Sequence, residues 1–253
     1  SDIRFCQADR TKLSYWIEEW NPSGNSTIWV NVTQNRTDTI YIYYGNPSAE
    51  SESNGTSTFV FFDDFEGSAL DTAKWVVEEQ EPTIQNSICK VVGGDSVEAI
   101  RTKISFDPPF IVHFYMKPDS WSAGDWDSGI AIGQSTTNLL GFTDDARGNY
   151  LAIMRLWWSL TDDISISRSD YSTFHEYQVI MTSTGSIFKD LTDGRTNNDD
   201  YSRSYSGYLW LVNDNENGNN KGYYDRVFVR KYASPEPKAT IGAEEIAMPT
   251  KPQ

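Results

Sequence analysis

Residues 28–44, IWVNVTQNRTDTIYIYY, contain two apolar runs separated by a polar segment. In the run at 28–32 the aliphatic side chains occupy every second position, which leaves Asn31 on the opposite face. In the run at 40–44 the isoleucines share a face with Tyr44. A period of two residues is that of a β-strand with one face buried, so this stretch predicts two strands of a sheet.

Further strand-like runs follow along the chain, and Gly, Asn, Asp, Ser or Pro residues separate nearly all of them. Helical periodicity is hard to find, and the turn around 69–74 is the best candidate for a helix. Short strands with polar connections are typical of an antiparallel β-sandwich, such as a jelly roll. We therefore expect an all-β fold, with further strands at 59–63, 97–106, 110–117, 128–133, 149–158, 176–182, 208–212 and 223–232.

The segment at 46–58 is polar and contains Pro and Gly, as connections between domains usually do. We predict a small N-terminal β unit at 1–57, followed by a larger sandwich at 58–242. The last residues, AEEIAMPTKPQ at 243–253, have two prolines and no periodicity. We expect them to form a tail or a linker.

The chain has 253 residues, enough to bury a sizeable core, and its formal net charge is −15. Such a charge repels a phosphate backbone, which argues against nucleic acid as a partner. No stretch approaches the roughly twenty apolar residues that span a bilayer, and the first residues lack the apolar core of a signal peptide. We expect no membrane span, although a leader or an anchor can have been removed from either end.

Asn-x-Ser/Thr sequons are crowded into the first quarter of the chain, in polar sequence, at Asn25, Asn31, Asn35 and Asn54. This crowding favours a glycosylated, secreted or cell-surface protein. The two cysteines, Cys6 and Cys89, could then form one disulfide. Two buried thiols are the alternative, because spacing in sequence does not give the distance between them.

Several phrases resemble known families. DIRF near the start, LSYWIEEW at 13–20, IYIYYGNPSA at 40–49 and the FFDDFE block are similar to a DUF2341-type module, a domain of unknown function of archaeal and bacterial surface proteins. The following part closes with YYDRVFVRKYASPEP at 223–237 and IGAEE at 241–245. It resembles the concanavalin A-like lectin/glucanase (laminin G-like) jelly roll that often accompanies that module. The first resemblance also implies a further β segment ahead of DIRF, so we expect an uncovered sheet edge.

Catalytic patterns are weak. Glucanases of the family that the chain resembles carry Glu-x-Asp-x-x-Glu on one strand, and no Glu here is followed two positions later by Asp. Asp125 and Asp127 share a strand face, but SAGDWDSG is more typical of a loop. His113 and His175 lack metal-ligand spacing, and each is expected to be a half-buried structural residue. We therefore predict that the protein is not an enzyme.

A structural calcium ion is a candidate cofactor. Asp63 and Asp64 end an apolar run, and adjacent side chains of a strand point to opposite faces, so both cannot face one ligand without a bulge. One of them could join Glu66 and backbone carbonyls around Ca²⁺. The jelly-roll resemblance makes the first and last strands neighbours and implies Asp225 as the distant ligand. The alternative is a set of solvated acids at a strand end. A weaker calcium-loop pattern at 213–220 is better explained as a hairpin loop.

Aromatic residues suggest a binding face. Arg155 and Trp157 alternate with apolar neighbours in one strand, as Tyr208 and Trp210 do in another. If the aliphatic faces form the core, these four side chains line the outer surface. Flat rings suit the C–H faces of sugars, and Arg donates to hydroxyl or acid groups. The alternative is that the rings pack under loops.

These patterns predict a non-catalytic extracellular cell-surface module that binds carbohydrate or mediates adhesion, with surface glycans or neighbouring copies of itself as partners. One alternative is a structural subunit of a surface layer or filament, assembled by strand complementation. A glycoside hydrolase relative is a further alternative.

Overall fold

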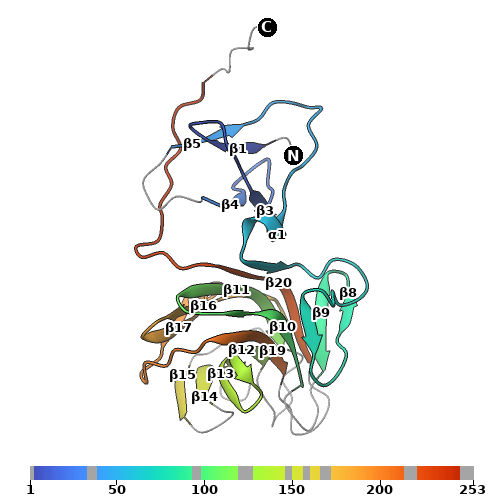
Figure 1. The fold of residues 1–253 in the computed structure, drawn as a ribbon, viewed down its shortest axis with the longest axis vertical. Helices are drawn as coiled ribbons and strands as arrows, with labels where there is room; N and C mark the ends of the chain where they lie inside the picture. Colours follow the sequence, from blue (N-terminus) through green and yellow to red (C-terminus); the bar gives the residue numbers. More distant parts are fainter. Residues whose placement is uncertain are drawn as a thin grey trace.

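The computed structural model describes residues 3–32, 39–92, 98–118, 128–145, 150–155, 160–165, 172–213 and 221–245. It is built almost entirely of antiparallel strands, which confirms the predicted all-β class (Figure 1). The only helix in the described part, α1 (Gly55–Thr58), is one turn long, and no helix there is long and apolar enough to cross a membrane.

The N-terminal unit contains a small sheet and a separate hairpin. The sheet has the order β2 (Lys12–Leu13), β1 (Arg4–Gln7), β5 (Ile40–Tyr43). The hairpin pairs β3 (Tyr15–Glu19) with β4 (Thr27–Val30). The predicted strands at 28–32 and 40–44 therefore exist, but in different sheets. Their core is formed by Ile3, Phe5, Leu13 and Tyr15.

The helix begins where the sequence suggested only a connection. The side chain of Asn54 accepts a hydrogen bond from the backbone N–H of Ser57, as an N-cap residue does. The predicted helical turn at 69–74 is instead a non-helical turn, in which the backbone N–H of Lys74 donates to the carbonyl of Asp71. The side chain of Asp71 also accepts from the N–H of Ala73, and the chain enters β7 at Trp75 before a helix can continue.

The remaining strands form a sandwich of two sheets. The seven-stranded sheet has the order β15 (Leu160–Ser165), β14 (Tyr150–Arg155), β13 (Asn138–Asp145), β12 (Ser128–Ser135), β19 (Gly207–Asn213), β10 (Glu98–Phe106), β7 (Trp75–Val77). The eight-stranded sheet runs β18 (Arg195–Asn198), β17 (Gly185–Asp190), β16 (His175–Thr182), β11 (Phe110–Pro118), β20 (Lys221–Lys231), β9 (Ile88–Val92), β8 (Thr83–Gln85). Its eighth strand, β6 (Phe61–Asp63), also pairs with β20, so the first and last strands of the sandwich are neighbours, as the resemblance implied.

In the FFDD stretch, neighbouring phenylalanines point to opposite faces of β6 and are buried in two different parts of the protein. Phe61 points into the core of the sandwich, where its ring lies 5.2 Å from that of Trp75. Phe62 points the other way and is buried against Trp16 of the N-terminal unit, with ring centres 4.9 Å apart. Burying a ring of this size stabilises a fold by about 1.5–3 kcal/mol, so β6 ties together both parts of the chain.

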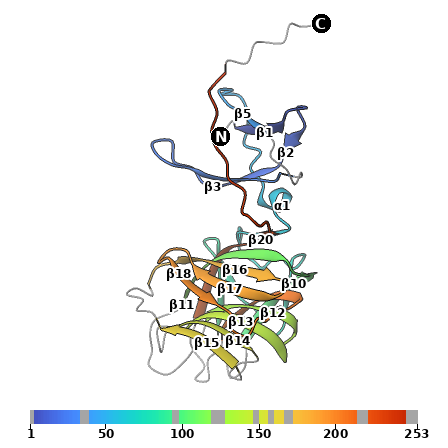
Figure 2. The ribbon, with the colours of Figure 1, turned by 90° about the vertical axis from the view of Figure 1, so that its left-hand side faces the viewer.

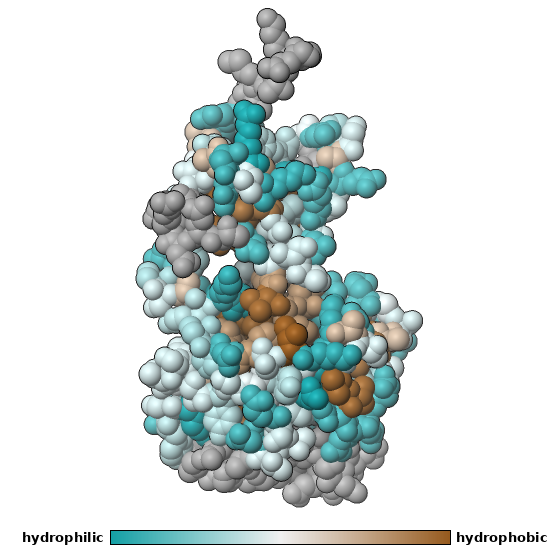
Figure 3. Space-filling view, viewed as in Figure 1, coloured by the Kyte–Doolittle hydropathy of each residue, from teal (hydrophilic) through white to brown (hydrophobic). Residues whose placement is uncertain are grey.

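The N-terminal unit lies against the outer face of the eight-stranded sheet (Figures 1 and 2). Phe228 of β20 is fully buried there, because the rings of Phe59, Trp29 and Trp16 lie 4.3, 5.4 and 5.7 Å from it. Figure 3 shows apolar surface gathered where the two parts meet. This aromatic junction, formed by Trp16, Trp29, Phe59, Phe62 and Phe228, fixes the N-terminal unit on the sandwich.

Candidate functional site

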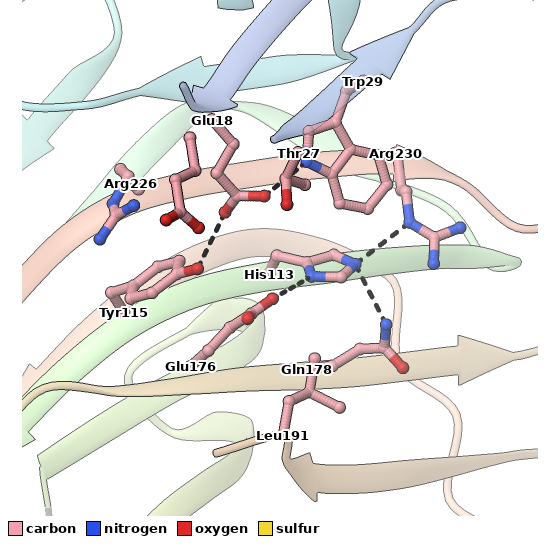
Figure 4. Close-up of a pocket in the computed structure, with 11 residues that line it drawn as sticks. Glu18, Thr27, Trp29, His113, Tyr115, Glu176, Gln178, Leu191, Arg226 and Arg230 are labelled. Carbon is pink, nitrogen blue, oxygen red and sulfur yellow. Dashed lines mark hydrogen bonds and ion pairs between the residues drawn. The ribbon is translucent and has the colours of Figure 1, made fainter. Parts of the chain in front are cut away.

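A cavity of about 600 Å³ lies beside the aromatic junction, between the β3–β4 hairpin and the outer face of β11, β16 and β20 (Figure 4). Both parts of the chain contribute to it. The cleft is lined by Glu18, Glu19, Thr27, Trp29, His113, Tyr115, Glu176, Gln178, Leu191, Arg226 and Arg230.

His113 lies in this cleft with both ring nitrogens engaged. Its Nε2 lies 3.1 Å from Nε of Arg230 and 3.1 Å from the amide nitrogen of Gln178, and both groups are donors. Nε2 is therefore the acceptor, and the proton resides on Nδ1, 3.4 Å from a carboxylate oxygen of Glu176. Burial and the nearby Arg230 charge lower the pKa of His113 against the opposing pull of Glu176. The ring is neutral near pH 7.

Glu18 connects the two parts of the chain across the cleft. One carboxylate oxygen accepts from Oη of Tyr115 at 2.9 Å, and the other accepts from Nε1 of Trp29 at 2.8 Å. Burial, followed by the charge of Glu18, raises the pKa of Tyr115, so its hydroxyl remains a donor. Charge-assisted bonds of this kind are roughly twice as strong as neutral ones.

A bulge directs Arg226 toward the cleft. The register between β11 and β20 shifts between His113 and Tyr115, and Arg226 has a left-handed φ of 47°. Tyr224 and Val227 both point into the core, so the two residues between them leave it together. The guanidinium carbon of Arg226 lies 3.8 Å from the ring centre of Tyr115. Bulges and left-handed residues concentrate at functional sites, where they redirect a side chain.

Arg230 supplies a second guanidinium near an aromatic ring. It lies 5.6 Å from the ring centre of Trp29 and forms two bonds of 3.1 Å with Glu236. The cleft therefore combines aromatic rings, guanidinium groups and carboxylates, which can contact the C–H faces and the hydroxyls of a polar ring compound.

The predicted carbohydrate-binding residues lie elsewhere. Tyr208 and Trp210 do share the outer face of the seven-stranded sheet, with the guanidinium carbon of Arg101 4.2 and 5.8 Å from their ring centres. Trp210 is only 2% exposed and donates to the carbonyl of Gly133, so the prediction of an exposed platform is wrong for this residue. Neighbouring residues cover the ring of Trp210. This agrees with the alternative interpretation, in which the rings are packed inside the protein. The side chain of Arg155, and Trp157 altogether, lie outside the described residues.

Of the predicted calcium ligands, Asp63 forms hydrogen bonds and an ion pair with other residues of the fold. Its Oδ1 accepts from the N–H of Phe65 at 3.0 Å, its Oδ2 accepts from Nε1 of Trp75 at 2.5 Å, and Lys74 lies 3.4 Å away. These donors occupy part of the acceptor capacity of Asp63, and its role as a calcium ligand stays a prediction. Glu66 accepts a hydrogen bond from Ser87.

Asp64 and Asp225 lie close enough to influence each other across the seam between β6 and β20. Burial raises the pKa of Asp64, and the charges of Asp63 and Glu66 add to it. Burial also raises the pKa of Asp225, and Asp64 contributes to that rise against the opposing charge of Arg226. In the described part of the chain, ligand atoms of the predicted four acids do not converge into a group of three. Calcium at this seam stays a prediction.

The His, Asp or Glu side chains that do converge in the described ranges are His175, Asp190 and Asp193. Nδ1 of His175 lies 2.8 Å from Asp190, whose same oxygen accepts from Nε of Arg195 at 2.9 Å. Arg195 also bonds Asp144 on the opposite sheet at 3.1 Å. The guanidinium of Arg195 pairs with the carboxylates of Asp144, Asp190 and Asp193, so this cluster is an ion-pair network between the sheets. Both histidines are buried, rather than half-buried as predicted.

The predicted disulfide is absent, because Cys6 and Cys89 are free thiols. Cys89 is fully buried in the core of the sandwich, whereas Cys6 belongs to β1 of the N-terminal unit. Among the sequons, Asn25 and Asn54 are exposed and Asn31 is partly exposed, while Asn35 lies outside the described residues. Glycosylation stays a prediction.

A family model and several solved structures each match part of the chain. The model of a family described as "Domain of unknown function (DUF2341)" matches residues 1–78, which confirms the first resemblance. That match covers the N-terminal unit and reaches β6 and β7 of the sandwich. No curated protein matches the chain.

Solved structures share the fold of the sandwich. A prokaryotic β-1,3-1,4-glucanase (lichenase) from a mouse hindgut metagenome is 12% identical, with a TM-score of 0.54 over 68% of this chain and 99% of its own. A pseudo β-1,3-glucanase of Mycobacterium tuberculosis is 11% identical, with a TM-score of 0.52 over 69% and 99%. A structure described with endo-acting O-glycanases of the human gut microbiota is 12% identical, with a TM-score of 0.52 over 69% and 100%. The resemblance to the concanavalin A-like jelly roll is thereby confirmed.

These structures correct the prediction that the protein is not an enzyme. A protein described as a glucanase and a structure described with O-glycanases share the jelly roll over nearly their full length, so this fold is compatible with an enzyme. The missing Glu-x-Asp-x-x-Glu pattern excluded one arrangement of carboxylates, not the chemistry as a whole. At these identities the likeness establishes the fold alone.

Sequence reasoning missed the cleft. Alternation in IVHFYM places His113 and Tyr115 on one strand face, which was available as a signal. Nothing in the pattern indicated that Glu18, 97 positions earlier, would meet Tyr115 there.

Proposed function

We propose that this protein interacts with carbohydrate and that a glycan binds in the cleft between the N-terminal unit and the eight-stranded sheet. The observation that carries the proposal is the pair of aromatic rings, Trp29 and Tyr115, each with a guanidinium beside it and carboxylates nearby. Sugar rings combine apolar C–H faces with hydroxyls, which suits this mixture of groups. The carbohydrate-related descriptions of the solved structures with this fold support the same ligand class.

The charges that line the cleft limit the kinds of glycan that can bind there. The lining contains three carboxylates, Glu18, Glu19 and Glu176, against the two guanidiniums of Arg226 and Arg230, with His113 neutral. The chain as a whole carries −15. A sulfated or uronate-rich polymer is repelled by this field, so neutral or amine-bearing glycans are the better ligands.

The proposed setting is the outside of a cell, with adhesion to surface glycans as the biological role. The cluster of sequons supports this setting, and the side chains of Asn25 and Asn54 are accessible. Glycosylated surface proteins commonly present such sites on exposed loops.

Glycoside hydrolysis in the same cleft is a second candidate. Figure 4 shows Glu18 and Glu176 reaching the cleft from opposite units. Two carboxylates on either side of a bound sugar are the minimum equipment of a glycosidase. Hydrolysis would release new reducing ends from a bound glycan.

A glycan array of neutral, amine-bearing and anionic glycans, followed by calorimetry, tests the binding site. Arg226→Ala should weaken any hit at least tenfold, which corresponds to about 1.4 kcal/mol. Arg101→Ala is the matched control, because Arg101 stacks on Tyr208 on the opposite sheet and is likewise paired with an acid, Glu78. Equal losses in both variants, or no hit with an intact fold, would remove the proposed site.

Assays for reducing ends on the same glycans test the second candidate. Glu176→Gln should abolish release while binding is kept. Binding without any release assigns the cleft to recognition alone.

Assembly of copies through a strand edge has one separate observation in its favour. The strand β5 exposes large side chains and pairs on one side alone within the described part of the chain.

A further inference from the structure

The strand β5 exposes an unusual row of large side chains. Tyr41, Ile42 and Tyr43 of β5 are 44, 48 and 43% exposed, and Tyr44, which follows the strand, is 60% exposed. They are consecutive, so both faces of the strand are apolar and both are open. Strands that are apolar on both faces are typical of sheets covered on both sides, so the exposure of this row is unusual.

The core of the N-terminal unit is left open at this strand. Ile42 lies opposite Phe5 in the ladder and therefore on the same face. Phe5 is 4% exposed, whereas Ile42 is about half exposed. In the described residues β5 pairs with β1 alone, so its other edge presents backbone donors and acceptors.

The edge also lacks the usual protection against pairing. Soluble proteins place Lys, Pro or a bulge on exposed edge strands. The run at 40–44 contains none of these and no charge, in a chain whose net charge is −15. Two copies that approach at most other surfaces meet repulsion, whereas at this edge they do not.

The segment after β20 is the nearest alternative occupant, and it does not fill the edge. In Figures 1 and 2 it passes beside the N-terminal unit, and Tyr44 donates a hydrogen bond to Glu244. Ile241, close by in the sequence, is 95% exposed, and residues 232–245 form no strand. Its prolines and glutamates at 235–237 and 244–245 suit a solvated segment rather than a ladder.

We infer that two copies of this chain pair through β5, edge to edge and antiparallel, to give one six-stranded sheet. This inference rests on the proposal that copies of the protein assemble through a strand edge. It identifies β5 as that edge. A two-fold antiparallel pairing places uncharged aromatic and aliphatic residues opposite one another, which is the favourable cross-strand combination. It also gives partners to the backbone donors and acceptors of the free edge of β5.

The interface is small. A strand of four residues buries less than about 1,200 Å², the lower limit of standard interfaces, so the dimer is weak and depends on concentration. Dense display of the protein on a surface would favour it by raising the local concentration.

Sedimentation velocity of the full chain over a concentration series tests the inference. The wild type should shift from monomer to dimer as concentration rises, and Ile42→Lys and Tyr41→Lys should each weaken the dimer at least tenfold. These two substitutions lie on opposite faces of β5, so loss of folding in one does not remove the test. Val60→Lys and Ile241→Lys are matched controls, because both residues are exposed and lie outside β5. Circular dichroism melts check each fold.

A monomer at every concentration overturns the inference. A dimer that survives both β5 substitutions shows assembly through another surface, and a dimer lost in Ile241→Lys alone assigns it to the tail. Both results contradict pairing through β5. Glycan binding measured on Ile42→Lys is expected to be unchanged, so failure of the cleft proposal and failure of this inference are distinguishable.

Discussion

Oη of Tyr115, on the outer face of the sandwich, donates a hydrogen bond of 2.9 Å to Glu18 in the N-terminal unit. The same carboxylate is held by Trp29 within its own unit. The hydrogen bond between Tyr115 and Glu18 joins residues that are 97 positions apart, and it holds the two sides of the cleft in place relative to each other. Stability of the docked arrangement and shape of the site depend on the same few atoms.

Tyr115→Phe should lower the free energy of unfolding by about 1.5–3 kcal/mol, because Glu18 loses a donor in a partly buried place. Urea denaturation of both proteins measures the change. Tyr201→Phe is the control, since Tyr201 is half exposed. Equal stability of Tyr115→Phe and the wild type would show that the bond contributes nothing net.

Asp190→Asn should destabilise the fold by about 1.5–3 kcal/mol, because buried Arg195 and His175 lose the charged acceptor of their hydrogen bonds, while Asp144 still pairs with Arg195. Burial raises the pKa of Asp190, but bonds from His175 and Arg195 outweigh it and lower the pKa to about 2. This stabilisation is complete above the ordinary Asp pKa of about 4 and is lost as pH falls through about 2. Thermal melts between pH 2 and 6 should show a flatter acid limb in Asp190→Asn. An unchanged limb would contradict the assignment.

The wild type should lose stability as pH falls from about 7.5 to 5.5 relative to His113→Gln. Burial lowers the pKa of His113, so the unfolded chain takes up a proton at about 6.5 that the folded chain refuses. Stability therefore rises with pH in this window. Gln can still accept from Arg230, and the difference in melting temperature between the two proteins across the window isolates the histidine. A constant difference would show that His113 titrates normally.

Melting temperatures can distinguish a calcium site at the seam between β6 and β20 from a set of solvated acids. If Ca²⁺ bridges Asp64 and Asp225, it should raise the melting temperature of the wild type, and Asp225→Asn should remove that rise. In EDTA the same substitution should be neutral or stabilising, because it relieves repulsion between two half-buried acids whose pKa values are raised. Equal melting temperatures of the wild type in calcium and in EDTA would remove the site.

Cys6 and Cys89 should stay unreactive toward a thiol reagent in the native protein. Both are buried, and burial raises the pKa of Cys89, which suppresses its reactive thiolate. Two thiols should titrate after unfolding, and a reducing agent should leave the melting temperature unchanged. An intact mass two daltons lower than the reduced chain would reveal a disulfide instead.

Much of the fold follows from period-two patterns, because a strand must divide its side chains between two faces. Alternation correctly separates Asp63 from Asp64 and places Tyr208 with Trp210. The period-two pattern does not predict whether a face is buried, because burial depends on what covers that face. The predicted exposure of Trp210 was therefore wrong. The cleft could not be predicted from the pattern for the same reason. His113 and Tyr115 were visible as neighbours on a strand, but their partners come from other strands and from another unit.

The aromatic junction around Phe228 has a practical consequence. A fragment that starts after residue 58 would keep every strand of the sandwich but would lose Trp16 and Trp29, which cover part of Phe62 and Phe228. We expect such a fragment to aggregate on expression, and we expect the intact chain to melt in one cooperative transition. The two halves are thus separable in their sequence signatures but not in their folding. A boundary drawn at the polar segment 46–58 would separate the rings of the aromatic junction.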